Sequence, residues 1–225
     1  VIEHLKKAQE TGKTLISFEV TPPERGSGVR DLFKIVEGIK KYNPGFIHVT
    51  SRAADAEYKQ QPDESFKRIV KRKRPGTLGA CASIQHKYGI DVVCHLLCDG
   101  FTKNETEDML IDLRNAEINN VFAVRGDESL YKKPTTPERI CNKHAVHLVK
   151  QIVDMNNGKY LEDLVGAEPT DFCIGVAGYP EKHSSSPNLK TDIQYLKQKI
   201  DAGADYIITQ MCFDNEKYFR FVDLC

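Results

Sequence analysis

Short apolar segments alternate along the chain with longer segments whose apolar residues recur at helical spacing. The apolar segments predict six strands, over Leu15–Val20, Phe46–Thr50, Val92–Cys98, Val121–Val124, Cys173–Tyr179 and Tyr206–Phe213. The helical spacing predicts helices over residues 2–11, 31–42, 62–73, 77–87, 102–117, 137–155 and 189–202, and a last helix from residue 215. Residues 51–61 and 156–171 are polar and are predicted to be loops.

Alternation of strands with helices predicts a parallel sheet whose strands are joined by helical crossovers. An open nucleotide-binding sheet would carry a Gly-rich turn after its first strand, but here that turn reads Thr-Pro-Pro-Glu-Arg over residues 21–25. The pattern therefore favours an α/β fold of the (β/α)8 TIM-barrel type, and residues 1–225 supply about six β/α units as a single barrel domain. Because six strands leave two apolar edges, we expect the natural protein to continue for roughly 60 to 80 residues beyond Cys225.

The charge balance and the cysteines argue against several classes of protein. The chain has 32 basic and 32 acidic side chains, so nothing in its net charge indicates a nucleic-acid or membrane partner. It has no run of eighteen apolar residues and no apolar segment of a signal peptide at its N-terminus, which predicts a cytoplasmic protein. The seven cysteines are odd in number and include no Cys-x-x-Cys spacing, which predicts reduced thiols.

Two local patterns receive ordinary interpretations. The basic run over residues 71–74 is interpreted as the solvated end of the 62–73 helix, where cations suit the helix dipole. Cys94 and Cys98 flank His95, which suggests a metal site. In a strand, however, positions 94 and 98 face one side and position 95 faces the other, so we expect no metal there.

A polar or ionisable residue ends each of the six predicted strands. These residues are Glu19, Thr50, His95, Arg125 with Asp127, Tyr179 and Gln210. Taken singly, Glu19 could be a carboxylate paired with an arginine, and His95 could be a hydrogen-bonded core histidine. The carboxyl ends of parallel strands converge on one face of a barrel, where such barrels place their active sites. Six coincident polar ends therefore predict one shared site.

Motifs at these strand ends follow one another in a fixed order over nearly the whole chain. They are Ser17-Phe18-Glu19 with Pro22-Pro23, His48-Val49-Thr50, His95-Leu96, Arg125-Gly126-Asp127, Tyr179-Pro180-Glu181 with His183, Asp201-Ala202-Gly203-Ala204 and Ile208-Thr209-Gln210. Each motif is weak by itself, but the ordered set is specific. In this set the chain resembles the methylenetetrahydrofolate reductase family.

The resemblance implies a catalytic barrel that binds FAD noncovalently at the carboxyl ends of its strands. It implies that NADH or NADPH delivers a hydride to the flavin and leaves. 5,10-Methylenetetrahydrofolate would then take its place and be reduced to 5-methyltetrahydrofolate, a step of one-carbon metabolism and methionine biosynthesis. The choice between NADH and NADPH stays open, and a homo-oligomer is compatible with the sequence.

The resemblance also assigns roles to individual residues. Glu19 is the expected general acid, because opening the methylene bridge requires protonation of a folate nitrogen. Asp127 would favour the cation that then forms, and Gln210 would contact the pterin or the nicotinamide through its amide. Glu19, Asp127 and Gln210 are thus the expected substrate-binding residues. The residues expected to line FAD are Thr50, His95, Arg125, Gly126, Asp127, His144, Ala145, Tyr179, His183, Asp192 and Lys199.

The chain departs from the family pattern in places, and other functions remain open. Val20 stands where many members have an aromatic residue, and Cys94 stands where a proline is frequent. Without the resemblance, Asp192 and Lys199 are equally well interpreted as solvated helix charges. One alternative function is a catalytically silent flavin-binding or folate-binding barrel. Another is a barrel aldolase or lyase, although the six strand ends offer no lysine for a Schiff base.

Overall fold

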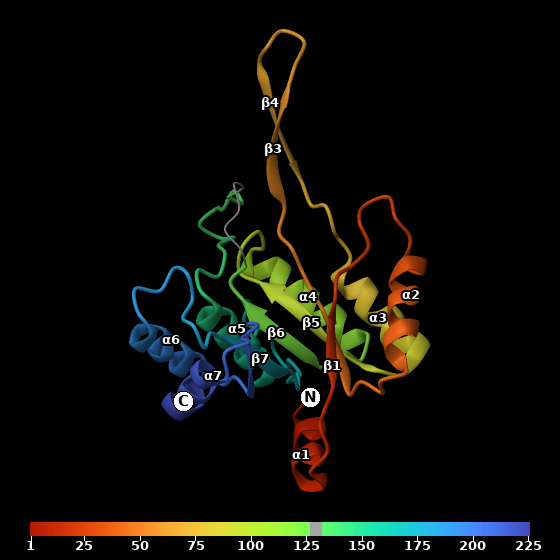
Figure 1. Cartoon of the computed structure of the whole chain (residues 1–225). Helices are drawn as coiled ribbons and strands as arrows, with labels where there is room; N and C mark the ends of the chain where they lie inside the picture. Colours follow the sequence, from red (N-terminus) through yellow and green to blue (C-terminus); the bar gives the residue numbers. More distant parts are fainter. Residues whose placement is uncertain (127–131) are drawn as a thin grey trace.

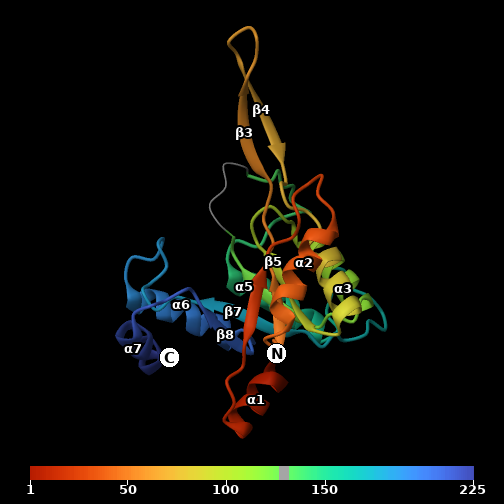
Figure 2. The same cartoon turned by 45° about the vertical axis from the view of Figure 1, so that its right-hand side comes forward.

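Six parallel strands form one curved sheet in the computed structural model, which describes residues 1–126 and 132–225 (Figures 1 and 2). The strands pair in the order β1 (Ser17–Val20), β2 (Phe46–Val49), β5 (Asp91–Leu97), β6 (Asn120–Val124), β7 (Cys173–Gly178) and β8 (Tyr206–Thr209). β1 and β8 form the two edges, so the sheet is a curled half-barrel. The predicted parallel α/β architecture with six strands is confirmed.

Seven helices occur in the described parts of the chain: α1 (Ile2–Thr11), α2 (Val29–Lys40), α3 (Thr77–Tyr88), α4 (Lys103–Asn115), α5 (Ala145–Asn156), α6 (Leu189–Asp201) and α7 (Asn215–Leu224). Helix α1 lies at the end of the sheet where the strands begin (Figure 1). The amino group of Val1 donates to the side chain of Asn120, and His4 lies 2.8 Å from the Asp91 carboxylate. A capping box of Thr102 and Glu105 starts α4: the Thr102 hydroxyl accepts from the backbone N–H of Glu105, and the Glu105 carboxylate accepts from the backbone N–H of Thr102.

Successive residues of each strand face opposite sides of the sheet, as they must in an extended chain. In β2, Ile47 and Val49 are buried in the large core between the sheet and the helices. Phe46 belongs instead to a second cluster on the concave side, inside the half-barrel, together with Val93, Phe122 and Tyr206. Side chains on the concave side therefore fill the interior near the start of a strand. Near the carboxyl end of the strand they face the open end of the half-barrel, which we call its mouth.

One predicted helix is wrong. The structure has no helix over residues 62–73 and no plain loop over 51–61, but an antiparallel hairpin of β3 (Asp55–Gln60) and β4 (Phe66–Lys71). Glu64, with φ 65°, makes the turn, and the Asp63 carboxylate accepts hydrogen bonds from the backbone and hydroxyl of Ser65. The hairpin stands away from the half-barrel (Figures 1 and 2), so the alternation of single strands with helices is interrupted once.

The predicted helix over residues 137–155 also begins later than expected. Helix α5 starts at Ala145, because His144 before it is extended, with φ −141°. The preceding described segment is held by isolated bridges, one from Cys141 to Thr102 and one between Thr136 and Arg139. These pairings occupy backbone groups that a longer helix would need.

The close packing of Gly175 against Tyr206 generates a stability prediction. A Cβ atom at Gly175 would lie 2.4 Å from the Tyr206 ring, so Gly175→Ala should lower the free energy of unfolding by about 1 to 3 kcal/mol. Gly79→Ala is the control, because its Cβ on α3 meets nothing within 4 Å and should raise stability by up to about 1 kcal/mol. Urea denaturation measures both. Equal stability of Gly175→Ala and the parent would contradict this packing.

Candidate active site

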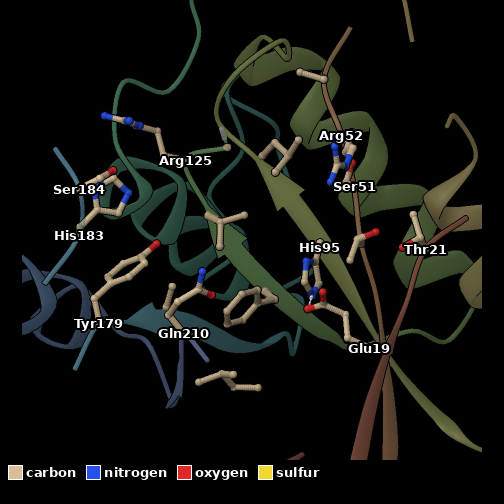
Figure 3. A pocket seen from close by; sticks show the side chains of 18 of the residues that line it. Glu19, Thr21, Ser51, Arg52, His95, Arg125, Tyr179, His183, Ser184 and Gln210 are labelled. Atoms are coloured by element: carbon tan, nitrogen blue, oxygen red, sulfur yellow. Dashed lines mark ion pairs between the residues drawn. The ribbon is translucent and has the colours of Figure 1, made fainter. Parts of the chain in front are cut away.

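A cavity of about 740 Å³ lies at the carboxyl ends of the strands. Figure 3 shows Glu19, Ser51, Arg52 and His95 on one wall and Arg125, Tyr179, His183 and Gln210 on the other. Its size falls within the range of about 300 to 1,000 Å³ that is typical of small-molecule sites. Eight of the residues predicted from the sequence line it: Glu19, Thr50, His95, Arg125, Gly126, Tyr179, His183 and Gln210.

Four of the other predicted residues do not line this cavity. His144 and Ala145 lie at the start of α5, and Asp192 and Lys199 lie on α6. Asp127 lies outside the described residues, so its role stays a prediction from the sequence resemblance.

A hydrogen-bonded histidine pair lies under the Glu19 side of the cavity. His48 Nδ1 and His95 Nε2 are 3.0 Å apart, and both side chains are buried. The two rings are also packed edge-on, and both contact the ring of Phe122. The pair thus lies at the boundary between the apolar interior of the half-barrel and the cavity at its mouth.

Both histidines are neutral at physiological pH. Burial lowers the pKa of His48 to about 4, and burial together with the neighbouring His48 lowers the pKa of His95 to about 3. Nε2 of His48 has no hydrogen-bond partner among the described residues. A buried N–H without a partner is costlier than a bare lone pair, so we place the shared proton on His48 Nδ1, which donates to His95 Nε2.

Glu19 faces the cavity directly above this pair. Its carboxylate lies 3.8 Å from His95 Nε2, and 62% of its side chain is exposed (Figure 3). Because His95 is neutral, this contact is no salt bridge at physiological pH. Partial burial raises the pKa of Glu19 above its ordinary value, while water in the cavity limits the shift. The site therefore favours a carboxyl group that holds its proton more readily than a free glutamate does.

The opposite wall is fixed by a network around His183. Its ring packs edge-on against Tyr179, with ring centres 4.7 Å apart. Nδ1 of His183 accepts from the backbone N–H of Ser185 at 3.1 Å, which leaves the proton on Nε2. The backbone N–H of His183 donates to the Asp192 carboxylate at 3.0 Å. Asp192 thus holds the loop that carries His183, a contact that its position on a helix did not predict.

Lys199 lies behind the same wall. Its Nζ donates to the carbonyl oxygen of Ala177, a residue that lines the cavity. Burial lowers the pKa of Lys199 to about 8, and the negative charge of Asp192 opposes this effect. The interpretation of Lys199 as a solvated helix charge therefore does not describe its surroundings.

Several lining residues were not predicted from the sequence. They come from the root of the hairpin and the loop before it: Ser51, Arg52, Ala53, Ala54, Asp55, Lys71 and Lys73. Lys71 and Lys73 belong to the basic run that helical spacing placed on a solvated helix end. Only the pairing of β4 with β3 shows where this run lies, because the hairpin returns the chain to the mouth of the half-barrel.

The sequence model of the methylenetetrahydrofolate reductase family matches residues 4–225 of the chain. The chain belongs to this family. The 5,10-methylenetetrahydrofolate reductases of Salmonella typhimurium and Escherichia coli are each 30% identical to it, over 97% of the chain and 62% of the relative. Methylenetetrahydrofolate reductase 2 of Saccharomyces cerevisiae is also 30% identical, over 98% of the chain and 33% of the relative. The chain thus spans about a third to three fifths of these methylenetetrahydrofolate reductases.

Solved structures agree on the architecture. A crystal structure of 2,3-dimethylmalate lyase, a member of the PEP mutase/isocitrate lyase superfamily, matches with a TM-score of 0.52 over 98% of this chain and 66% of the other. The two sequences are only 10% identical, so this likeness concerns the fold alone. Among the described residues, no helix is long and apolar enough to cross a membrane.

The buried histidine pair generates a pH prediction. Histidines in the unfolded chain titrate near pH 6.5, whereas folded His48 and His95 titrate at about 4 and 3. The unfolded state therefore binds more protons below pH 6.5. The free energy of unfolding should be highest above pH 6.5 and fall toward pH 4, by up to about 1.4 kcal/mol per pH unit for each histidine.

Replacement of one histidine should flatten this dependence. In His48→Leu, the loss of stability between pH 6.5 and pH 4.5, measured by urea denaturation, should be smaller than in the parent by up to about 1.4 kcal/mol per pH unit. His86→Leu is the control, because His86 lies exposed on α3. Parallel losses in His48→Leu and the parent would show that His48 is not held neutral by folding.

Proposed function

We propose that this chain forms the flavin-binding and catalytic part of a reductase that converts 5,10-methylenetetrahydrofolate to 5-methyltetrahydrofolate at the expense of NADH or NADPH. The single observation that carries the proposal is Glu19, a carboxyl group with a raised pKa on the wall of a large cavity. Membership of the methylenetetrahydrofolate reductase family supports it, as do the names of the relatives.

The chemistry of the cavity fits FAD. Oγ1 of Thr50 is buried and has no hydrogen-bond partner among the described residues, although Thr50 lines the cavity. A ligand in the cavity would satisfy it once the Thr50 side chain rotates its hydroxyl toward the cavity. Arg125 and the Nε2–H of His183 supply donors on the opposite wall, suited to the oxygen atoms of a pyrophosphate. When bound, FAD would accept a hydride from the nicotinamide and pass it to the one-carbon unit.

In this proposal Glu19 moves the proton that the folate requires. Protonation of a folate nitrogen by the Glu19 carboxyl group opens the methylene bridge and leaves a cationic carbon that can accept a hydride. Neutral His95 beside Glu19 neither neutralises the carboxylate nor repels that cation. The histidine pair therefore allows partial burial to raise the pKa of Glu19 without a fixed positive charge that would lower it again.

Gln210 orients the bound ring. Its amide projects into the cavity from the wall opposite Glu19 (Figure 3), and its backbone N–H donates to the Gly178 carbonyl at 2.8 Å. An amide both donates and accepts, so Gln210 can pair with the amide-like edge of a pterin or with the carboxamide of a nicotinamide. This dual pairing suits two substrates that occupy the site in turn.

The role of Glu19 is tested by separating the two half-reactions. In Glu19→Gln, bleaching of the flavin by NADH should keep its rate, because hydride transfer from the nicotinamide needs no general acid. Reoxidation by methylenetetrahydrofolate should slow by roughly a hundredfold or more, the usual contribution of a general acid. Stopped-flow absorbance of the flavin-loaded protein measures both rates.

Glu37→Gln serves as the matched control, because Glu37 is exposed on α2, and both of its rates should equal those of the parent. Equal slowing of both half-reactions in Glu19→Gln would show that Glu19 acts in ligand binding rather than as the acid. Binding of flavin and folate by the parent without any turnover would favour the silent-barrel alternative.

A further inference from the structure

Side-chain contacts at its root attach the β3–β4 hairpin to the mouth of the half-barrel. Arg72, just after β4, donates to the carbonyl oxygen of Arg52 at 2.8 Å and to the hydroxyl of Ser51 at 3.1 Å. The guanidinium of Arg72 also lies 4.8 Å from the centre of the Phe101 ring. An isolated two-stranded hairpin is only marginally stable in water, so these contacts at the root are what fix its direction.

A second set of contacts ties the root to the loop after β1. The backbone N–H of Arg25 donates to the Lys73 carbonyl at 2.7 Å. Arg74 donates to the Pro22 carbonyl at 2.9 Å and forms an ion pair with Glu24 at 2.6 Å. The arginines of the basic run 71–74 are thus used to anchor the hairpin, whereas its two lysines are not.

Those two lysines face the cavity and share one carboxylate. Lys71 and Lys73 both line the cavity, and their ammonium groups lie 3.3 and 2.6 Å from the two oxygens of Glu57. A single carboxylate balances only one of the two charges. Glu57 therefore holds two ammonium groups side by side at the rim, and Asp55, opposite Lys71 in the hairpin, supplies a further negative charge near Lys73. Arg52 adds another cation to the same rim.

The described lining of the whole cavity also carries more positive than negative side chains. It contains five cationic side chains, Arg52, Lys71, Lys73, Arg125 and Lys182, and two carboxylates, Glu19 and Asp55. Arg125 lies on the wall opposite Arg52 (Figure 3). The proposed FAD pyrophosphate would use the Arg125 wall, so the cations on the hairpin side remain available for a different anion.

We infer that Lys71, Lys73 and Arg52 form a second anion-binding site on the hairpin side of the mouth, which holds the negatively charged end of a substrate whose reacting ring lies near Glu19. This inference rests on the proposed function. Two substrates carry such an end: the folate, through the carboxylates of its glutamate tail, and the nicotinamide dinucleotide, through its phosphates. Both would run from the reacting centre out along the rim.

Calorimetric titration of the flavin-loaded protein tests the site without requiring turnover. The ligands are NAD⁺, which carries the same phosphates as NADH but cannot reduce the flavin, and folate carrying either one or five glutamates. For Lys71→Ala/Lys73→Ala we expect the Kd of the recognised ligand to rise roughly fivefold, and the difference to shrink at high salt, as for exposed ionic contacts. A rise for pentaglutamyl folate alone identifies the glutamate tail. A rise for NAD⁺ alone identifies the dinucleotide phosphates.

Two further variants separate charge from structure. Lys59→Ala/Lys67→Ala makes the same change on the same face of the hairpin, nearer its tip and away from the cavity, and should leave every Kd unchanged. Glu57→Gln frees both ammonium groups and should tighten binding about twofold, which a merely structural role would not produce.

The inference is overturned if Lys71→Ala/Lys73→Ala binds all ligands as the Lys59→Ala/Lys67→Ala control does, or if Glu57→Gln weakens binding as the lysine variants do. A parent protein that binds these ligands tightly but does not turn over would contradict the proposed function and leave the site standing. A parent that binds none of them would contradict both.

Discussion

The filling of the half-barrel interior determines where a reactive site can form. Phe46, Val93, Phe122 and Tyr206 occupy the inward-facing positions low in the sheet, and Gly175 leaves the space that the Tyr206 ring requires. Above this apolar floor, the next inward-facing positions meet an open cavity. Because side chains alternate along a strand, only residues at those positions reach the mouth from the sheet. The floor thus sets the level of the site.

The hydrogen bond between His48 and His95 lies at the boundary between floor and mouth. A charged histidine at this depth would require desolvation of its charge, which burial opposes strongly. The pair therefore stays neutral and presents Glu19 with a polar neighbour that carries no charge. In this way the protein surrounds one ionisable carboxyl group with partly buried walls and fixed dipoles, and partial burial raises its pKa above that of a free glutamate.

The strand ends could be predicted from the sequence because they depend on local patterns. Glu19, His95 and Gln210 each follow an apolar segment, and parallel pairing then brings them to one face. His48 was part of a motif, but its hydrogen bond to His95 depends on the register between two strands far apart in the chain. Likewise, the contact of Asp192 with the His183 loop depends on how α6 meets the sheet.

The hairpin was missed for a physical reason. Phe66, Ile69 and Val70 have the i, i+3, i+4 spacing of an amphipathic helix, so the local pattern favoured that structure. Pairing with residues 55–60 supplies hydrogen bonds that the local pattern does not reveal. Because these residues form a hairpin, Lys71 and Lys73 lie at the rim of the cavity and not at the solvated helix end that the local pattern predicts.

The central claim, that the mouth of the half-barrel is a flavin-dependent reductase site, is tested most directly by absorbance spectroscopy. The protein is purified, loaded with FAD and separated from unbound flavin, and its visible spectrum is then followed without oxygen. We expect a flavin band that NADH or NADPH bleaches and that methylenetetrahydrofolate restores. A protein that retains no flavin, or a bleached band that methylenetetrahydrofolate leaves unchanged, would contradict it.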